Sequence, residues 1–188
     1  MEEKNKVWKT VSSKYLFRRP WLTVRCEDML LPNGNHIPEY YILEYPDWVN
    51  TIAITKEGKF VFVRQYRPGI QRTCYELCAG VCEAEDASPL VSAQRELWEE
   101  TGYGKGNWQE YMVVSANPST HTNLTHCFLA TDVELIDHQH LEDTEDLSVH
   151  LLTLEEVRSL LENNEIMQSL NAAPLWKYMA SLQSKIII

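Results

Sequence analysis

The chain has 188 residues, of which 44% are hydrophobic and 23% are charged, and its formal net charge is −10. This length suits one globular domain with a small appendage and allows a substantial core. Nucleic acids and membrane surfaces require basic patches on the proteins that bind them, so we expect neither as a partner. An anionic small substrate would need bound cations and a few placed arginines.

The N-terminus and the cysteines together indicate location. Residues 1–10 are polar and charged, so they predict no secretory leader, and no apolar run approaches the roughly 20 residues of a membrane span. Five cysteines is an odd number, which argues against a secreted disulfide framework. Cys74, Cys78 and Cys82 lack the spacing of a Cys-x-x-Cys knuckle, and we interpret them as buried thiols. A thiol-based metal module is the less favoured interpretation of these three cysteines. A cytoplasmic location is predicted.

The first part of the chain is predicted to be mostly β. Residues 21–45 indicate two strands around the turn signal Pro32-Asn33-Gly34-Asn35. Further strands are predicted from apolar patterns and turn residues, at 50–55, 60–65, 108–115, 124–130 and 148–152. A capping box, Thr153-x-x-Glu156, opens a helix near the C-terminus, and Pro174 is predicted to begin the last helix.

A helix is predicted between Ser88 and Gly102. Ser88 is a good N-cap, Pro89 suits the first helical position, and Gly102 can take the left-handed conformation that ends a helix. An apolar stripe at helical spacing would face the core, formed by Leu90, Ala93 and Leu97.

Three carboxylates, those of Glu96, Glu99 and Glu100, would gather on another face of this helix. Without a cation they repel one another, whereas a hard divalent ion such as Mg²⁺ prefers carboxylate oxygens as ligands. A solvated acidic face is the alternative, and it is the better interpretation for a helix taken without its context.

That context is Arg95-Glu96-Leu97-x-Glu99-Glu100-x-Gly102-Tyr103, preceded by Gly80. The pattern resembles the Nudix box, with Tyr103 in place of an aliphatic residue. The first half departs from the family, because the spacing from Gly80 to Arg95 is one residue too long and Ala87 stands where the family has its first glutamate. Glu85 or Asp86 could compensate across a one-residue insertion.

The resemblance implies an α/β fold, namely a Nudix-type α/β/α sandwich with a mixed β-sheet, preceded by a small N-terminal antiparallel β domain. We expect residues 1–48 to form this β-rich dimerisation segment and residues 49–188 to form the hydrolase domain. The segments 63–68 and 76–80 are similar to the lead-in of ADP-sugar diphosphatases, particularly the ADP-ribose enzymes. Pro118, fifteen residues after Tyr103, lies close to where ADP-ribose members carry a proline. In that subfamily the N-terminal β domain joins two subunits into a homodimer.

The resemblance also implies roles for the acidic residues. Mg²⁺, with Mn²⁺ as a possible substitute, would be bound by Glu96, Glu99, Glu100, Glu145 and the Ala79 carbonyl. Arg95 would orient these carboxylates. A long acidic connection, 131–146, would bring Glu145 onto the metals and a second carboxylate beside the attacking water, so the catalytic set would be Arg95, Glu99, Asp143 and Glu145. A solvated loop of like charges is the alternative for this run.

Four residues are candidates for binding the substrate. Trp21 and Tyr40 could stack on a base, although packing within the β domain explains them equally well. Arg67 could hold a phosphate or a ribose through its forked donors, with a surface ion pair as the alternative. Pro118 is the fourth candidate, and a plain turn is its alternative.

The function implied is Mg²⁺-dependent hydrolysis of the diphosphate bond of a nucleoside diphosphate sugar, from ADP-ribose to AMP and ribose 5-phosphate. One alternative is a Nudix hydrolase of another nucleotide sugar such as GDP-mannose. The other is a non-catalytic ADP-ribose-binding sensor, which the irregular first half of the box would favour.

Overall fold

The computed structural model describes residues 6–184, so the ends of the two predicted domains, 1–5 and 185–188, lie outside the described residues. The chain divides into two compact units. The smaller contains residues up to 46 together with 117–123, and the larger contains 47–116 and the residues from 124 onward. The described part of the chain has no helix that is both long and apolar enough to cross a membrane.

The smaller unit is a three-stranded antiparallel sheet in the order β1-β2-β3, with β1 at Lys9–Arg19, β2 at Leu22–Leu30 and β3 at His36–Glu44. The predicted turn joins β2 to β3, and Gly34 in it has a φ of 87°, which favours glycine. Loop 117–123 joins this unit, because the Leu43 N–H donates to the Thr120 carbonyl at 2.8 Å. β1 was not predicted.

The larger unit is built on an eight-stranded mixed sheet. Its central order is β11-β5-β4-β10-β8, with β6 beside β5, β7 beside β4 and β9 beside β10. β10 runs parallel to β4 and the other pairs are antiparallel. The strands are β4 Trp48–Thr55, β5 Phe60–Arg67, β6 Arg72–Glu76, β7 Cys78–Val81, β8 Tyr103–Gly104, β9 Asn107–Val114, β10 Thr125–Leu135 and β11 Leu147–Leu152.

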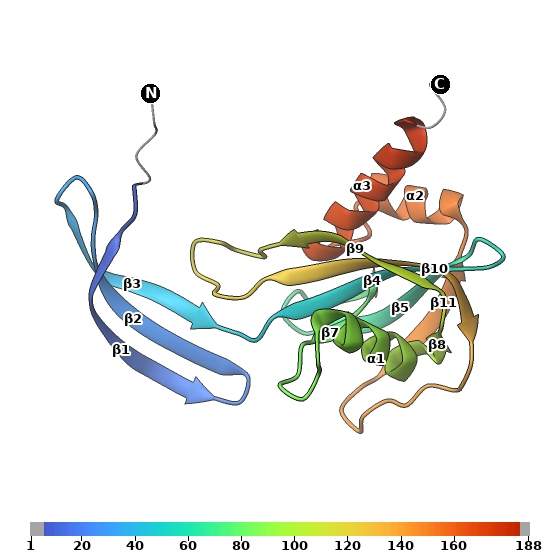
Figure 1. Ribbon diagram of the computed structural model, residues 1–188, viewed down its shortest axis with the longest axis horizontal. Coiled ribbons are helices and arrows are strands. Elements are labelled where there is room, and N and C mark those ends of the chain that lie inside the picture. Colours follow the sequence, from blue (N-terminus) through green and yellow to red (C-terminus); the bar gives the residue numbers. More distant parts are fainter. Residues whose placement is uncertain (1–5, 185–188) are drawn as a thin grey trace. The chain divides into compact units, whose positions relative to one another are not determined.

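Helices cover both faces of this sheet. Helix α1, Pro89–Thr101, lies on one face, and α2, Leu154–Glu162, and α3, Ser169–Ser184, lie on the other (Figure 1). The predicted α/β/α sandwich with a mixed sheet and an N-terminal antiparallel sheet is therefore confirmed. The predicted ends of α1 are also correct, since the Ser88 hydroxyl accepts from the Val91 N–H and Gly102 has a φ of 74°.

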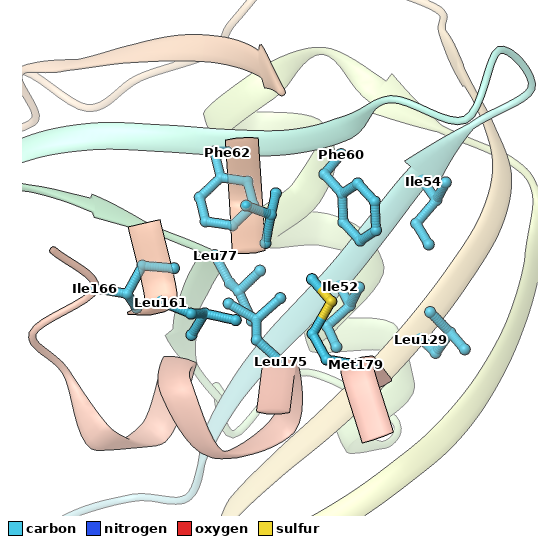
Figure 2. Close-up of a cluster of buried hydrophobic side chains, with 11 residues drawn as sticks. Ile52, Ile54, Phe60, Phe62, Leu77, Leu129, Leu161, Ile166, Leu175 and Met179 are labelled. Atoms are coloured by element: carbon cyan, nitrogen blue, oxygen red, sulfur yellow. The ribbon is translucent and has the colours of Figure 1, made fainter. Parts of the chain in front are cut away.

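The main apolar core lies between the sheet and helices α2 and α3. Figure 2 shows Phe62, Leu77 and Leu175 converging there, all three nearly inaccessible to solvent. Burying each such side chain contributes roughly 1.5–3 kcal/mol. On the opposite face Ala93 and Leu97 of α1 are buried as predicted, while Leu90 is only half-buried.

The prediction that Pro174 begins the last helix is wrong, because α3 begins five residues earlier, at Ser169. A proline inside a helix lacks the N–H that would bond to the carbonyl four residues before it, here that of Leu170. The Leu170 carbonyl instead accepts the side-chain amide of buried Asn50 at 2.8 Å. The strand therefore supplies the donor that the helix lacks.

Candidate active site

The site begins where β7 passes under helix α1. Gly80 on β7 pairs with Val49 on β4, which holds its backbone in the sheet. A Cβ added to Gly80 would overlap the carboxyl group of Glu96. The Glu96 side chain therefore lies directly over the Gly80 backbone, and only glycine leaves room for it.

Glu100 is the most enclosed carboxyl group of the site, with 4% of its surface exposed. Its Oε2 atom accepts the Ala79 N–H at 3.1 Å, and the Cys78 thiol also bonds to it. Burial raises the pKa of Glu100 to about 8, and the charges of Glu96 and Glu145 add to the shift. Burial also raises the pKa of Glu96, against the opposing charge of Arg95.

Arg95 organises the remaining carboxylates. Its Nη1 atom donates to Glu96 Oε1 at 2.9 Å and to Glu99 Oε2 at 2.8 Å. Its Nη2 atom donates to the Val81 carbonyl at 3.0 Å and to Asp86 Oδ2 at 3.1 Å. One guanidinium thus ties helix α1 to the loop that precedes it, which is the geometry that an orienting role requires.

Of the two residues that could compensate for Ala87, Glu85 and Asp86, it is Asp86 that contacts Arg95. Its carboxylate accepts from both Nε and Nη2 of Arg95, whereas Glu85 is exposed. Burial opposes ionisation of Asp86, but the hydrogen bonds from Arg95 and Ser92 lower its pKa overall. The loop therefore accommodates its additional residue before α1 and still presents a carboxylate to Arg95.

The acidic connection reaches this site through Glu145, whose charge raises the pKa of both Glu96 and Glu100. Glu145 lies in a tight turn in which the Glu142 N–H donates to its Oε2 atom at 3.0 Å. Asp143 lies in the same turn and is exposed to solvent.

A cavity of about 360 Å³ opens beside Gly80, between β4, β7, β10 and the start of α3. Its lining includes Trp48, Arg67, Ala79 and Asn171. Its place next to the Glu96 carboxyl makes it the candidate substrate cavity of this unit.

Arg67 forms an ion pair, as in the alternative interpretation of this residue, but with a buried partner instead of one at the surface. Its Nε and Nη2 atoms donate to the carboxylate of Glu76 at 2.9 and 2.5 Å, and Glu76 is 2% exposed. The hydrogen bonds that Arg67 donates to Glu76 raise the pKa of Arg67. The partner of Arg67 was not predicted from sequence. Arg67 ends β5 and Glu76 ends β6, two strands that pair as a hairpin.

The other predicted substrate ligands lie in the smaller unit. Trp21, in the turn between β1 and β2, is 82% exposed. Tyr40 on β3 packs edge-on against Trp8, and its hydroxyl donates to the Ser119 carbonyl at 2.6 Å. Pro118 lies in the loop that carries Ser119.

The cysteines are unpaired thiols. Cys74 and Cys78 are buried as predicted, but Cys82 is only half-buried. Within residues 6–184, the three do not form a cluster of metal-ligating side chains.

A mixed sheet between helical layers, with arginine-ordered glutamates on α1, defines the class of the protein as an α/β/α sandwich with a carboxylate site. A model of the NUDIX domain matches residues 45–172, and a model of the nucleoside diphosphate sugar hydrolase N-terminal domain matches residues 8–43. The chain belongs to the Nudix hydrolase family, and it is an enzyme of that family.

Curated relatives agree with this assignment. An ADP-ribose pyrophosphatase of Bacillus subtilis is 31% identical, covering 84% of this chain and 85% of the relative. A methanol dehydrogenase activator of Bacillus methanolicus is 30% identical over 86% of both chains. A solved structure described as an ADP compounds hydrolase has the same fold, with a TM-score of 0.82 at 20% identity over 95% of both chains.

Proposed function

We propose that this enzyme hydrolyses the diphosphate bond of a nucleoside diphosphate sugar in a Mg²⁺-dependent reaction, converting ADP-ribose to AMP and ribose 5-phosphate. The observation that carries the proposal is the group formed by Glu96, Glu99 and Glu100, ordered by Arg95 over the Gly80 backbone. The name of the Bacillus subtilis relative supports ADP-ribose as the substrate.

The carboxylates fit a hard divalent cation. Burial raises the pKa of Glu96 and Glu100, so the protein alone does not fully stabilise their ionised forms. A bound cation would supply the missing positive charge. Mg²⁺, or Mn²⁺ in its place, would be held by these two residues with Glu99, Glu145 and the Ala79 carbonyl. Bound there, the metal would neutralise charge on the diphosphate oxygens.

The side chains of this site would have different roles in hydrolysis. Arg95 holds Glu96 and Glu99 in place through its two hydrogen bonds. A carboxylate takes a proton from water as the water oxygen bonds to phosphorus and the bridging P–O bond breaks, releasing the two monophosphates. Glu99, Asp143 and Glu145 are the candidates for this base.

The N-terminal sheet is proposed to join two copies of the chain into a homodimer, with residues 1–48 as the dimerisation segment and 49–188 as the hydrolase domain. Strand β1 is an edge strand whose residues are all exposed. Its exposed apolar side chains, Val11, Tyr15, Leu16 and Phe17, are typical of a surface that pairs with another chain. Trp21 in this unit offers an aromatic face for adenine.

A cytoplasmic location is proposed with this function. All five cysteines are free thiols, which a reducing compartment maintains. Hydrolysis of GDP-mannose is the second candidate reaction, because contacts to the base would come from loops that the family motif does not specify.

The test is AMP release from ADP-ribose by the purified protein with and without Mg²⁺, beside a parallel reaction on GDP-mannose. Glu96→Gln and Glu100→Gln are expected to lower the rate by more than tenfold, because each removes a carboxylate charge. Glu162→Gln, an exposed glutamate at the end of α2, is the matched control and should keep full activity. Activity on GDP-mannose but not on ADP-ribose would show that GDP-mannose is the substrate. Ligand binding without turnover would favour a sensor.

A further inference from the structure

A second group of metal-ligating side chains lies outside the glutamate site, in the segment that follows β10. Asp137, His138 and His140 each offer one ligand atom, and these atoms all lie within 4.8 Å of one another. Asp137 Oδ1 lies 2.7 Å from His138 Nδ1, and Asp137 Oδ2 lies 3.0 Å from His140 Nε2. One carboxylate is therefore bracketed by two imidazoles.

The backbone of this segment is fastened to the end of helix α1. The N–H groups of Ile136 and Asp137 donate to the Gly102 carbonyl at 2.9 and 3.2 Å, and the His140 N–H donates to the Glu99 carbonyl at 2.8 Å. The last carbonyls of a helix have no partner within it, so this segment satisfies groups that need a donor. The three side chains are thus presented by a fixed main chain.

The two imidazoles differ in their freedom. The His140 ring stacks on Trp98 of α1, with ring centroids 4.1 Å apart and an interplanar angle of 28°. The side chain of His138 is 79% exposed, so it can adjust its position, and solvent reaches the cluster from that side. The cluster therefore combines one fixed ligand, one adjustable ligand and an open path for an ion.

We propose that Asp137, His138 and His140 form a binding site for a divalent transition-metal ion that prefers imidazole, such as Zn²⁺, Ni²⁺ or Co²⁺. Two imidazoles and one carboxylate are a ligand set for these ions, whereas Mg²⁺ prefers oxygen ligands alone. Metal–ligand bonds of about 2.0–2.1 Å place neighbouring ligand atoms of a tetrahedral site about 3.3 Å apart. The two oxygen–nitrogen distances of 2.7 and 3.0 Å need to open by only a few tenths of an ångström. The exposed His138 ring can adjust its distance to His140, which is within 4.8 Å, and water would complete the coordination.

The site would therefore differ from the glutamate site in the class of ion that it selects. An ion held there would bridge the segment 137–140 to the C-terminal end of α1 through Trp98 and the backbone of Glu99. Binding to the folded state alone raises the midpoint of thermal unfolding by mass action. Metal binding at this site can therefore be measured as a rise in that midpoint, independently of catalysis.

The experiment is a calorimetric titration of the untagged protein with Ni²⁺ in a large excess of Mg²⁺, which occupies the oxygen-ligand sites. We expect one Ni²⁺ per chain, bound at least tenfold more weakly after His138→Ala and not detectably after His138→Ala with His140→Ala. His36→Ala is the matched control, because His36 pairs with Asp28 at 3.2 Å but belongs to no three-residue cluster among the described residues. It should bind Ni²⁺ like the parent protein.

Tryptophan fluorescence adds a second measurement. Ni²⁺ bound beside His140 should quench the emission of Trp98, and Trp98→Phe should abolish the Ni²⁺-dependent part of the signal. Far-UV circular dichroism without metal verifies that each variant folds, and His138→Gln provides a conservative replacement. Unchanged affinity in the histidine variants, or loss of Ni²⁺ binding in Glu96→Gln with the histidines intact, would overturn the proposal.

Discussion

Asp86 and Arg95 form an ion pair between helix α1 and the loop that carries the additional residue of the Nudix box. Both Nε and Nη2 of Arg95 point to Asp86 Oδ2, at 3.4 and 3.1 Å. The same guanidinium holds Glu96 and Glu99. A carboxylate one residue before the position in the family pattern thus still reaches Arg95, because the loop before α1 accommodates the additional residue.

Asp86→Asn should lower activity by about 10–100-fold, the loss typical when a residue that orients metal ligands is changed. The amide keeps the size of the side chain but removes the charge that anchors Arg95. Glu85→Gln, at the neighbouring exposed position, is the control and should leave the rate unchanged. The measurement is the rate of AMP release at saturating Mg²⁺, and equal rates for both variants would contradict the role given to Asp86.

Gly80→Ala should abolish most activity, because the new methyl group would occupy the space of the Glu96 carboxyl. Displacement of one ligand should also weaken Mg²⁺ binding, measured as a higher Mg²⁺ concentration for half-maximal rate. Gly69→Ala is a matched control, since a Cβ there meets nothing within 4 Å. Wild-type Mg²⁺ dependence in Gly80→Ala would show that Glu96 can bind Mg²⁺ without lying over the Gly80 backbone.

The metal-free protein should lose stability as pH rises from about 5 to about 8. The pKa of Glu100 is about 8 in the folded protein, against an ordinary value of 4.5, so the folded state binds more protons than the unfolded state within this window. The free energy of unfolding therefore falls as Glu100 ionises, and Glu96 acts in the same direction. The measurement is the midpoint of thermal unfolding against pH in a chelator.

Glu100→Gln should flatten this pH dependence, while Glu162→Gln should retain it. Added Mg²⁺ should restore stability at the higher pH, because the ion binds the ionised carboxylate. A midpoint that rises through this window in the chelated parent protein would contradict the raised pKa of Glu100.

Local signals predicted the local structure well. Ser88, Pro89 and Gly102 specify the ends of α1 through their own backbone preferences, and the structure places those ends as expected. The family motif then identified the carboxylates on the helix. The partner of Arg95 could not be chosen from sequence, because the backbone conformation of the loop decides whether Glu85 or Asp86 faces Arg95.

Elements that depend on distant contacts were harder to predict. Strand β1 was missed because all of its residues are exposed, so it lacks the alternation that marks a strand with one buried face. Strands β6 and β7 were missed because each is very short. β7 also pairs with β4 rather than with the strand before it in the chain. The start of α3 was misplaced because the partner of the Leu170 carbonyl, Asn50, is 120 residues away.

Asn50→Ala should destabilise the protein by roughly 1–3 kcal/mol, since it leaves the buried Leu170 carbonyl without a donor. Pro174→Ala restores a backbone N–H that can reach this carbonyl from within the helix. The cost of Asn50→Ala should therefore be smaller in the Pro174→Ala background, which a double-mutant cycle of urea unfolding measures. Equal costs in both backgrounds would show that the strand amide does not replace the missing helical hydrogen bond.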